Sequence, residues 1–257
     1  MEIQLQVAPN SINRGISVLI YSNPGVGKTT LGTTLPKEET LFVVTEAGMG
    51  PLIGKGFQYF DVLAAMKNNP LMPLEEIIQE FYKDLRTRNG LGFKYIVIDN
   101  LTELENQLLG DYTRRRKKPF PEGKEYGDVA YRIHEWVVLF RDLTYQGITV
   151  IFNVWERQAE IKSSTGEMYT MAYPFLSGRN SVQIPGLVDA VGHLSTKGEV
   201  RTVDFSQNTL CLTKSQFQGL SKEPADLMLI LNKINSFNYN SQEITNETKR
   251  RKKLPQI

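Results

Sequence analysis

Short apolar runs alternate along the chain with segments of helical periodicity. Four runs are rich in β-branched side chains and end at Gly, Pro or polar residues, as strands buried on both faces do; they span residues 16–21, 41–44, 95–98 and 148–154. Apolar side chains recur at helical spacing between residues 73 and 88, and helices are also predicted over residues 28–35, 101–109, 129–145 and 224–234. This alternation predicts an α/β fold in which helices cover both faces of a mostly parallel sheet.

The C-terminal part of the chain follows a different pattern. Residues 157–186 are rich in Gly, Ser, Thr and Tyr and show no period, so we predict a long functional loop there. Two runs that flank a turn at residues 196–198 predict a β-hairpin, and residues 209–213 predict one more short strand. Polar, Asn-rich and basic residues then predict a disordered tail. We therefore expect one domain over residues 1–234 and a flexible basic tail over residues 235–257.

Composition excludes several classes of protein. The chain has 257 residues, of which 40% are hydrophobic, so it can bury a sizeable core and is not a disordered protein. Its single cysteine, Cys211, allows neither an intramolecular disulfide nor a cysteine-based zinc site, and it favours a reducing compartment. No apolar run approaches the length of a membrane span, and the N-terminus has neither a basic start nor an apolar segment. We expect a soluble cytoplasmic protein without a membrane partner.

The net charge of +2 hides an uneven distribution of charge. Ten of the 30 Lys and Arg residues lie in two pentads, at residues 114–118 and 249–253, which leaves 20 basic against 28 acidic residues elsewhere. A mildly acidic body thus carries two concentrated cationic segments. This pattern favours local contact with a polyanion such as a nucleic acid.

The segment SNPGVGKT at residues 22–29 follows a predicted strand and begins a predicted helix, which is the context of a P-loop. Gly25 and Gly27 let backbone N–H groups converge on phosphates, Lys28 reaches the β- and γ-phosphates, and the Thr29 hydroxyl ligates Mg²⁺. Ser22 replaces the first glycine of the G-x-x-x-x-G-K-[ST] pattern. The alternative is a Gly-rich turn that carries Lys-Thr by coincidence. The predicted cofactor-binding residues are Asn23, Pro24, Gly25, Val26, Gly27, Lys28, Thr29 and Thr30.

Two acidic residues end neighbouring predicted strands. Asp99 follows the run YIVI and is placed to organise Mg²⁺ together with Thr29, although an Asp there also caps the following helix. Glu46 follows the run LFVV and is placed to orient or deprotonate the water that attacks the γ-phosphate. The alternative for Glu46 is a solvated side chain in a Gly-rich loop. The sequence thus predicts ATP and Mg²⁺ as cofactors.

The order of these motifs, followed by a strand that ends near Asn153 and a long loop, resembles the core of RecA-type recombinases. More closely, YSNPGVGKTT, VVTEAGMG, YIVIDNLTEL, YPFLSG, IPGLVDAVGHL and FQGLSKEPADLMLIL resemble phage-encoded RecA-like ATPases of the Sak type, over residues 15–234. The resemblance implies an ATP- and Mg²⁺-dependent single-strand annealing or recombination protein. It also implies a homo-oligomer, as filament or ring, in the cytoplasm of a bacterial host. Single-stranded DNA is the expected partner, and a single-stranded-DNA-binding protein is a further candidate.

RecA-type proteins bind single-stranded DNA through two loops, and the resemblance places them at residues 111–127 and 157–186. Both segments combine cations, which neutralise phosphates, with aromatic rings, which stack on bases. The alternative for the basic pentad is a solvated charge run. The predicted DNA-binding residues are Arg114, Arg115, Arg116, Lys117, Lys118, Phe120, Lys162 and Arg179.

A K-x-R pair in related assemblies reaches the γ-phosphate of the neighbouring subunit. Here the resemblance carries over Lys214 alone, because Gln216 stands where the arginine would be, and a solvated Lys at a strand end is the alternative. We therefore expect a slow ATPase that DNA and assembly stimulate. Two other functions stay open: a helicase or helicase loader on the same core, and a non-enzymatic DNA-binding scaffold that nucleotide stabilises.

Overall fold

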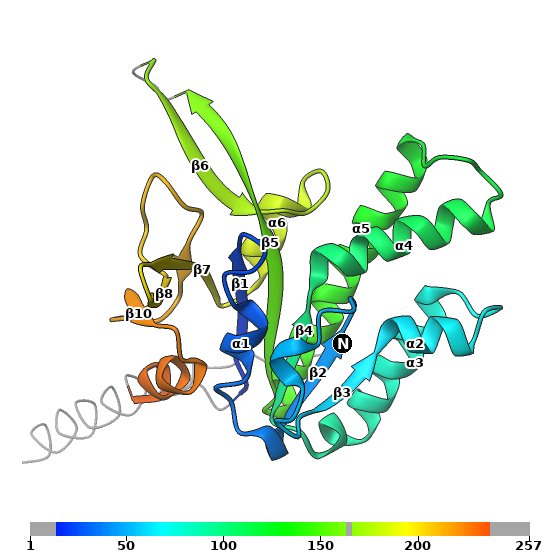
Figure 1. Ribbon diagram of the computed structural model, residues 1–257, viewed down its shortest axis with the longest axis horizontal. Helices are drawn as coiled ribbons and strands as arrows, with labels where there is room; N and C mark the ends of the chain where they lie inside the picture. The colour runs from blue at the N-terminus through cyan, green and yellow to red at the C-terminus, as the bar shows by residue number, and fades with distance from the viewer. Residues whose placement is uncertain (1–13, 163–165, 237–257) are drawn as a thin grey trace, which may run out of the picture.

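A ten-stranded sheet forms the centre of the computed structural model, which describes residues 14–162 and 166–236 (Figure 1). The strands are β1 (Ser17–Ser22), β2 (Thr40–Val44), β3 (Gln58–Asp61), β4 (Tyr95–Asp99), β5 (Thr149–Lys162), β6 (Met168–Pro174), β7 (Ala190–Lys197), β8 (Val200–Asp204), β9 (Lys214–Ser215) and β10 (Lys222–Pro224). The α-helices are α1 (Lys28–Gly32), α2 (Val62–Asn68), α3 (Leu74–Thr87), α4 (Leu101–Arg115), α5 (Gly123–Asp142), α6 (Asn180–Leu187) and a helix over residues 227–236. The 3-10 turns are η1 (Lys37–Glu39), η2 (Gly50–Leu52), η3 (Asn89–Gly92) and η4 (Leu143–Gln146).

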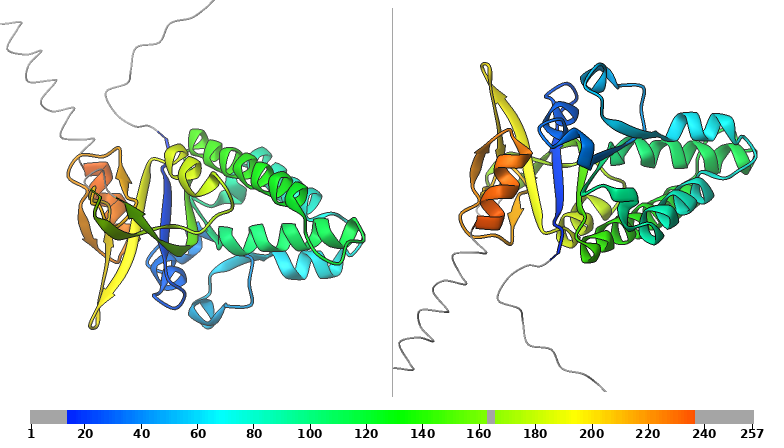
Figure 2. Two further views of the ribbon diagram at one scale, coloured as in Figure 1. Left: turned by 90° about the horizontal axis from the view of Figure 1, so that it is seen from above. Right: turned by 90° about the horizontal axis from the view of Figure 1, so that it is seen from below.

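The sheet is parallel from β7 to β3, and its antiparallel pairs lie beyond β7 and along the end of β5. The strand order is β10-β8-β7-β1-β5-β4-β2-β3, and the pairs from β7 to β3 in this order are parallel. Strands β8 and β10 join antiparallel, β6 folds back on β5, and β9 pairs with β7. In both views of Figure 2, helices α4 and α5 and the β7–β8 hairpin lie on opposite sides of β1. The arrangement confirms the predicted α/β class and the predicted hairpin.

Two hydrophobic cores cover the two faces of the sheet, as the apolar runs predict. Successive side chains of a strand point to opposite faces, so Leu19 and Tyr21 of β1 join one core while Val18 and Ile20 join the other. The first core also contains apolar residues of α3, α4, α5 and α6. The second contains Leu31 of α1 and the helix over residues 227–236. Burial on both faces explains why the central strands contain few polar residues.

Several predicted boundaries are wrong. Residues 157–186 do not form one long loop, because β5 continues to Lys162 and pairs with β6, and α6 follows. Much of the predicted loop at residues 111–127 is helical, since α4 ends at Arg115 and α5 begins at Gly123. Residues 209–213 contribute a single bridge, from Cys211 to Ala172, in place of a strand. The outer part of the β5–β6 hairpin was missed because its side chains are exposed or half-exposed, so it has no buried apolar run (Figure 1).

Two further predictions concern the C-terminal end of the chain. The last predicted helix begins at residue 227, after the short strand β10, and not at residue 224. The predicted basic tail lies outside the described residues, apart from its first two positions, which belong to this helix. Within the described ranges, no helix has the length and apolar character needed to cross a membrane.

An ion pair fixes the start of β1 against the start of β7. Asp189, 4% exposed, accepts bonds from two nitrogens of Arg14 (2.6 and 3.1 Å) and from the backbone N–H and hydroxyl of Ser17 (both 2.8 Å). Burial opposes ionisation of Asp189, but the bonds from Arg14 and Ser17 hold the pKa of its carboxyl below the usual value. The carboxylate therefore satisfies three groups that the fold buries or half-buries.

Asp189→Asn is expected to lower the free energy of unfolding by about 2–4 kcal/mol, because it leaves the Arg14 charge and the Ser17 donors poorly paired. Asp189 contributes its stability above the ordinary carboxyl pKa and loses it as the pH falls through the lower folded-state pKa. The difference between variant and wild type in urea unfolding should therefore be full at neutral pH and shrink in acid.

The matched control is Asp142→Asn, which removes a half-exposed pair with Arg141 and is expected to cost less than about 1 kcal/mol. Equal stabilities of the Asp189 and Asp142 variants would contradict the assigned role of Asp189.

Candidate functional site

The parallel register brings the carboxyl ends of four strands to one edge of the sheet. Val44 pairs with Asp99 and Ile98 with Phe152, so the residues that follow β2 lie beside Asp99, and Asp99 lies beside Asn153. Ile20 pairs with Asn153, which places the end of β1 at the same level. Ligands of parallel α/β sheets bind at this edge. The P-loop, Glu46 and Asp99 therefore meet there, as the sequence predicts.

The P-loop has the backbone that its glycines allow. Gly25 and Gly27 adopt positive φ angles of 81° and 111°, and Gly27 caps α1, whose first residue is Lys28. Lys28 is 7% exposed, and its ammonium donates to the carbonyl and hydroxyl oxygens of Ser22 (3.0 and 3.1 Å) and to the carbonyl of Asn23 (3.2 Å). Ser22, which replaces the consensus glycine, thus serves as a partner of the lysine.

Burial lowers the pKa of Lys28 to about 8, and the charges of Asp99, Glu46 and Glu156 only partly offset this effect. Three carboxylates therefore surround one cation whose charged form is poorly solvated. An incoming phosphate would stabilise the ammonium and compete for the bonds it now makes to the loop.

Asp99 is the carboxylate best placed to organise a cation. It is 5% exposed and accepts a hydrogen bond from the Asn153 amide (3.0 Å). Burial raises its pKa, and hydrogen bonding to Thr29 and Asn153 and the charge of Lys28 act in the opposite direction. The structure thus places Thr29 and Asp99, the two predicted metal ligands, side by side. Asn153, whose role the sequence left open, orients Asp99.

Glu46 lies just beyond β2, partly buried, at the mouth of the same site. Burial raises its pKa, and the nearby Asp99 carboxylate raises it further. The preceding residue, Thr45, is fixed by bonds between its side chain and the backbone of Asn100 (2.8 and 2.9 Å) and by an N–H bond to the Asp99 carbonyl (3.0 Å). A carboxylate with a raised pKa in a fixed position is suited to accept a proton from water.

The residues fit a nucleoside triphosphate with Mg²⁺. A Cβ added at Gly25 would meet no atom within 4 Å, so the loop is open at that point. Among the described residues, the Asn100 Nδ2 atom beside Asp99 is buried without a hydrogen bond of normal geometry, and the Asn100 side chain interacts with the Glu46 carboxylate. Over the same residues, no three His, Cys, Asp or Glu side chains form a metal site of their own. Thr29 and Asp99 would therefore hold Mg²⁺ together with phosphate oxygens, and the ion would neutralise phosphate charge.

Sequence reasoning missed Glu156 as part of this site. Its side chain accepts from the Asn23 amide of the P-loop (3.2 Å), and its other oxygen lies 2.9 Å from His193 Nε2. The opposite ring nitrogen of His193 lies 3.2 Å from Cys211 Sγ. His193 is thus bonded on both sides, and Cys211 is half-buried beside it. No sequence signal indicates Glu156, because its partners Asn23 and His193 lie on two other elements, the P-loop and β7.

A second feature, an aromatic cavity of about 550 Å³, lies between α5 and the base of the β5–β6 hairpin. Its rings are Tyr126, Tyr173 and Phe175, and Arg157 lies over the Phe175 ring at 5.8 Å. Tyr126 and Phe175 are 46% and 41% exposed. The cavity joins the two segments that the sequence predicts as DNA-binding, although their secondary structure differs from the prediction.

The basic pentad lies at the C-terminal end of α4 and in the turn before α5, and most of its charge is paired within the chain. Arg114 and Arg115 bond to Asp111 (2.8 and 2.9 Å), while Arg116 bonds to Glu125 and Asp128 (both 2.7 Å). Lys118 bonds to Glu122 and Glu125. Hydrogen bonding to Arg116 lowers the pKa of Glu125 to about 2, so this pairing persists over the usual pH range.

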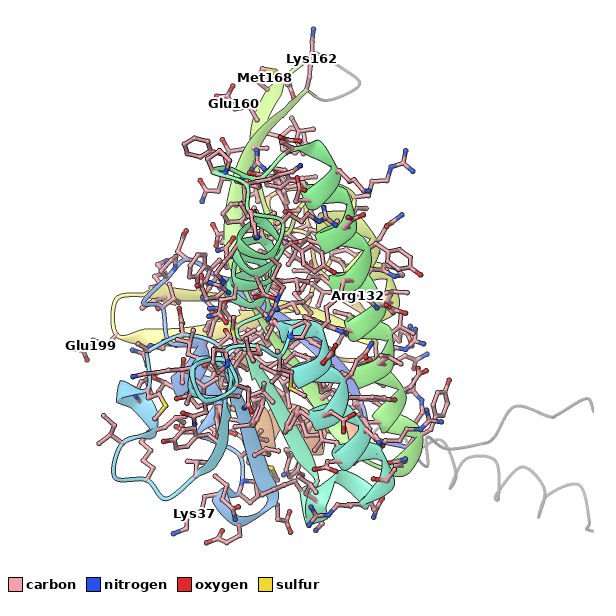
Figure 3. All side chains as sticks on the ribbon, turned by 90° about the vertical axis from the view of Figure 1, so that its right-hand side faces the viewer. Lys37, Arg132, Glu160, Lys162, Met168 and Glu199 are labelled. Atoms are coloured by element: carbon pink, nitrogen blue, oxygen red, sulfur yellow. The ribbon has the colours of Figure 1, made fainter. Side chains whose placement is uncertain are left out.

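The other predicted DNA-binding residues are spread out. Phe120, in the turn between α4 and α5, is 76% exposed. Lys162 lies at the tip of the β5–β6 hairpin with Glu160 and Met168, far from the body of the molecule (Figure 3). Arg179 is exposed at the start of α6. None of these three lines the aromatic cavity.

Lys214 holds the end of α6 within its own chain. Its ammonium donates to the carbonyl oxygens of Val188 (2.7 Å) and Gly186 (2.8 Å), and burial lowers its pKa. A lysine in this position satisfies the last carbonyls of a helix. These contacts favour a structural role, so its action on a neighbouring subunit stays a prediction.

Residues 14–217 match a family described as an AAA domain. A search of the curated proteins finds no match. Among solved structures, a KaiC-like protein from the hyperthermophilic archaeon Pyrococcus horikoshii OT3 is similar over 82% of this chain and 85% of its own, with 15% sequence identity and a TM-score of 0.43. The family match spans well over half of the chain and includes the P-loop, Glu46 and Asp99. The protein therefore belongs to the AAA-domain family of P-loop ATPases.

Proposed function

We propose that the protein is an ATP- and Mg²⁺-dependent ATPase that binds single-stranded DNA and acts, as an oligomer, in recombination or strand annealing. The resemblance to Sak-type ATPases motivates this proposal, and the aromatic cavity is the observation that carries it. Rings stack on unpaired bases without regard to sequence, and duplex DNA does not offer its base faces in this way.

The cavity has the composition of a base-stacking site. Three rings and one guanidinium line a space of about 550 Å³, which is large enough for a nucleobase. Arg116 bonds to Glu125, the residue before Tyr126, so one arginine of the basic pentad is held next in sequence to the cavity wall. A strand with its bases in the cavity would place its phosphates near this pentad.

Hydrogen bonds connect the cavity to the nucleotide site. Thr102, in the first turn of α4 and three residues after Asp99, donates its hydroxyl to the Phe175 carbonyl and accepts from the Trp155 N–H (both 3.0 Å). The Phe175 N–H donates to the Trp155 carbonyl (2.7 Å). A shift of α4 on nucleotide binding would therefore move Phe175, which supports stimulation of the ATPase by DNA.

Glu105 adds a second connection between α4 and the cavity. Its carboxylate accepts from the Ser177 N–H (3.0 and 3.2 Å), and burial raises its pKa to about 6. Ser177 itself lines the cavity. The α4 helix thus binds the wall of the cavity at two points one turn apart.

Three assays on the purified protein test the proposed function: ATP hydrolysis with and without single-stranded DNA, annealing of complementary strands, and unwinding of a duplex. We expect DNA-stimulated hydrolysis and annealing without unwinding. Unwinding would instead identify a motor. DNA binding without turnover would identify a scaffold.

Lys28→Ala is expected to abolish tight ATP binding and to leave the fold intact, because it removes the cation that faces the phosphates. In the wild type, ATP binding should weaken about tenfold from about pH 7 to about pH 9, since the free protein loses the Lys28 proton near pH 8. Titration of ATP at several pH values measures both effects. Unchanged affinity in the variant would remove the basis of the nucleotide site.

Glu46→Gln should separate ATP binding from turnover. The amide keeps the size of the side chain but cannot accept a proton, so hydrolysis is expected to fall ~10²-fold or more while ATP still binds. Single-turnover hydrolysis together with a binding titration measures the two quantities. Wild-type turnover in this variant would show that another group positions the water.

Tyr126→Ala is expected to weaken single-stranded DNA binding by roughly five-fold or more, the value of one stacked base. Tyr131→Ala is the matched control, because Tyr131 lies on the same helix, is 67% exposed and does not line the cavity. Fluorescence anisotropy with a homopolymeric oligonucleotide measures the affinity. If both variants bind like the wild type, the cavity is not on the DNA path and the basic pentad remains the candidate.

A further inference from the structure

The β7–β8 hairpin, which is not part of the P-loop motif, places an arginine against the P-loop. A Cβ placed on Gly27 would lie 3.2 Å from the Cζ and Nη1 atoms of Arg201. Arg201 is 174 positions away in the sequence, yet its guanidinium lies against the residue that precedes Lys28. Position 27 favours glycine for its positive φ, and the Arg201 guanidinium packs closely against it.

The sheet explains why Arg201 reaches this place. On β7, His193 pairs with Tyr21 of β1, near the end of that strand. Thr196 follows three residues later and pairs with Arg201 of β8. Arg201 therefore lies beyond the end of β1, where the P-loop begins. Side chains two positions apart in a strand share a face. Arg201 therefore shares its face with Val203, which belongs to the same core as Leu31 of α1.

Gly192 brings the two strands close on this face. A Cβ at position 192 would lie 2.5 Å from Val203 and 3.0 Å from Ile20, so its absence lets Val203 pack across β7 toward β1. The backbone of Arg201 is fixed on its other side by a bond from the Ala225 N–H (3.2 Å). The position of this arginine is thus set by two neighbouring strands. Figure 3 shows the turn of the hairpin, marked by Glu199, at the edge of the molecule.

The guanidinium is available for a ligand. Arg201 is exposed, and over residues 14–162 and 166–236 its side chain has no ion pair or hydrogen bond to a protein group. In contrast, four of the five cations in the basic pentad are paired. An unpaired guanidinium beside the loop that binds phosphates offers a planar pair of donors for phosphate oxygens.

The charge balance of the nucleotide site favours a second cation near the P-loop. The charges of Asp99, Glu46 and Glu156 all act on Lys28, so the site holds three carboxylates against one ammonium before a nucleotide arrives. A triphosphate adds several negative charges, which these carboxylates repel. Mg²⁺ neutralises part of the added charge, and a second cation at the P-loop would neutralise more.

We propose that Arg201 binds the phosphate chain of the nucleotide within its own subunit, as a cation that complements Lys28 from the outer side of the P-loop. This inference deepens the proposed function, because it rests on nucleotide binding at the P-loop. It does not depend on DNA binding, and its test uses no DNA.

The experiment measures the dissociation constants of Mg-ATP and of inorganic triphosphate for the full chain at fixed ionic strength. Arg201→Gln should weaken both ligands about tenfold or more, the effect of a lost charge-assisted hydrogen bond. Arg201→Lys should recover part of the loss, since it restores the charge without the planar fork. Lys222→Gln is the matched control, because Lys222 is an exposed cation on the neighbouring strand β10, and it should change both constants less than twofold.

Each other outcome overturns the proposal in a distinct way. Loss of ATP affinity with unchanged triphosphate affinity would show that Arg201 contacts the base or ribose. Wild-type constants for Arg201→Gln would show that the arginine does not touch the nucleotide. Thermal unfolding without nucleotide separates these effects from misfolding. Lys28→Ala, measured in parallel, separates failure of this proposal from failure of the nucleotide site, because only the latter leaves both Lys28→Ala and Arg201→Gln unchanged.

Discussion

The parallel pairing of β1, β5, β4 and β2 determines where every polar group of the nucleotide site lies. These strands, with β5 over its first six residues, are buried on both faces, so functional side chains occupy positions at or near the ends of the buried segments, where the backbone leaves the core. The register aligns these ends, and it thereby places Asp99 between Asn153 on one side and the segment with Glu46 on the other. A shift of one residue in any pair would separate these groups and move side chains from one hydrophobic core to the other.

Burying these charged groups together costs free energy, and their shifted pKa values reflect this cost. Burial lowers the pKa of Lys28 and raises those of Asp99 and Glu46, so each group is displaced toward its neutral form. The chain limits the cost with local bonds: Lys28 binds oxygens of its own loop, and Asn153 binds Asp99. A nucleotide with Mg²⁺ would replace these bonds by stronger ones between full charges, which makes the site favourable only when it is loaded.

Hydrogen bonds from α4 also connect the nucleotide site to the aromatic cavity. Thr102 and Glu105 belong to the helix that follows Asp99 directly, and both bond to the segment that carries Phe175. The basic pentad, in contrast, is bonded mainly to acidic residues of α4 and α5. Its local field is therefore weaker than the count of five cations suggests, and ring stacking carries more of the proposed contact with DNA.

The sequence alone determined the buried strands, the P-loop and the acidic residues at the strand ends, because each depends on a local pattern of apolar runs, glycines and charges. It could not show that β5 continues into an exposed hairpin, since a strand with exposed and half-exposed side chains has no buried apolar run. Nor could it show Glu156 at Asn23 or Arg201 at Gly27, because these contacts join elements that lie far apart in the sequence. Tertiary structure also decided which cations are paired, since an ion pair depends on distances of a few ångströms that only the packing of helices and strands fixes.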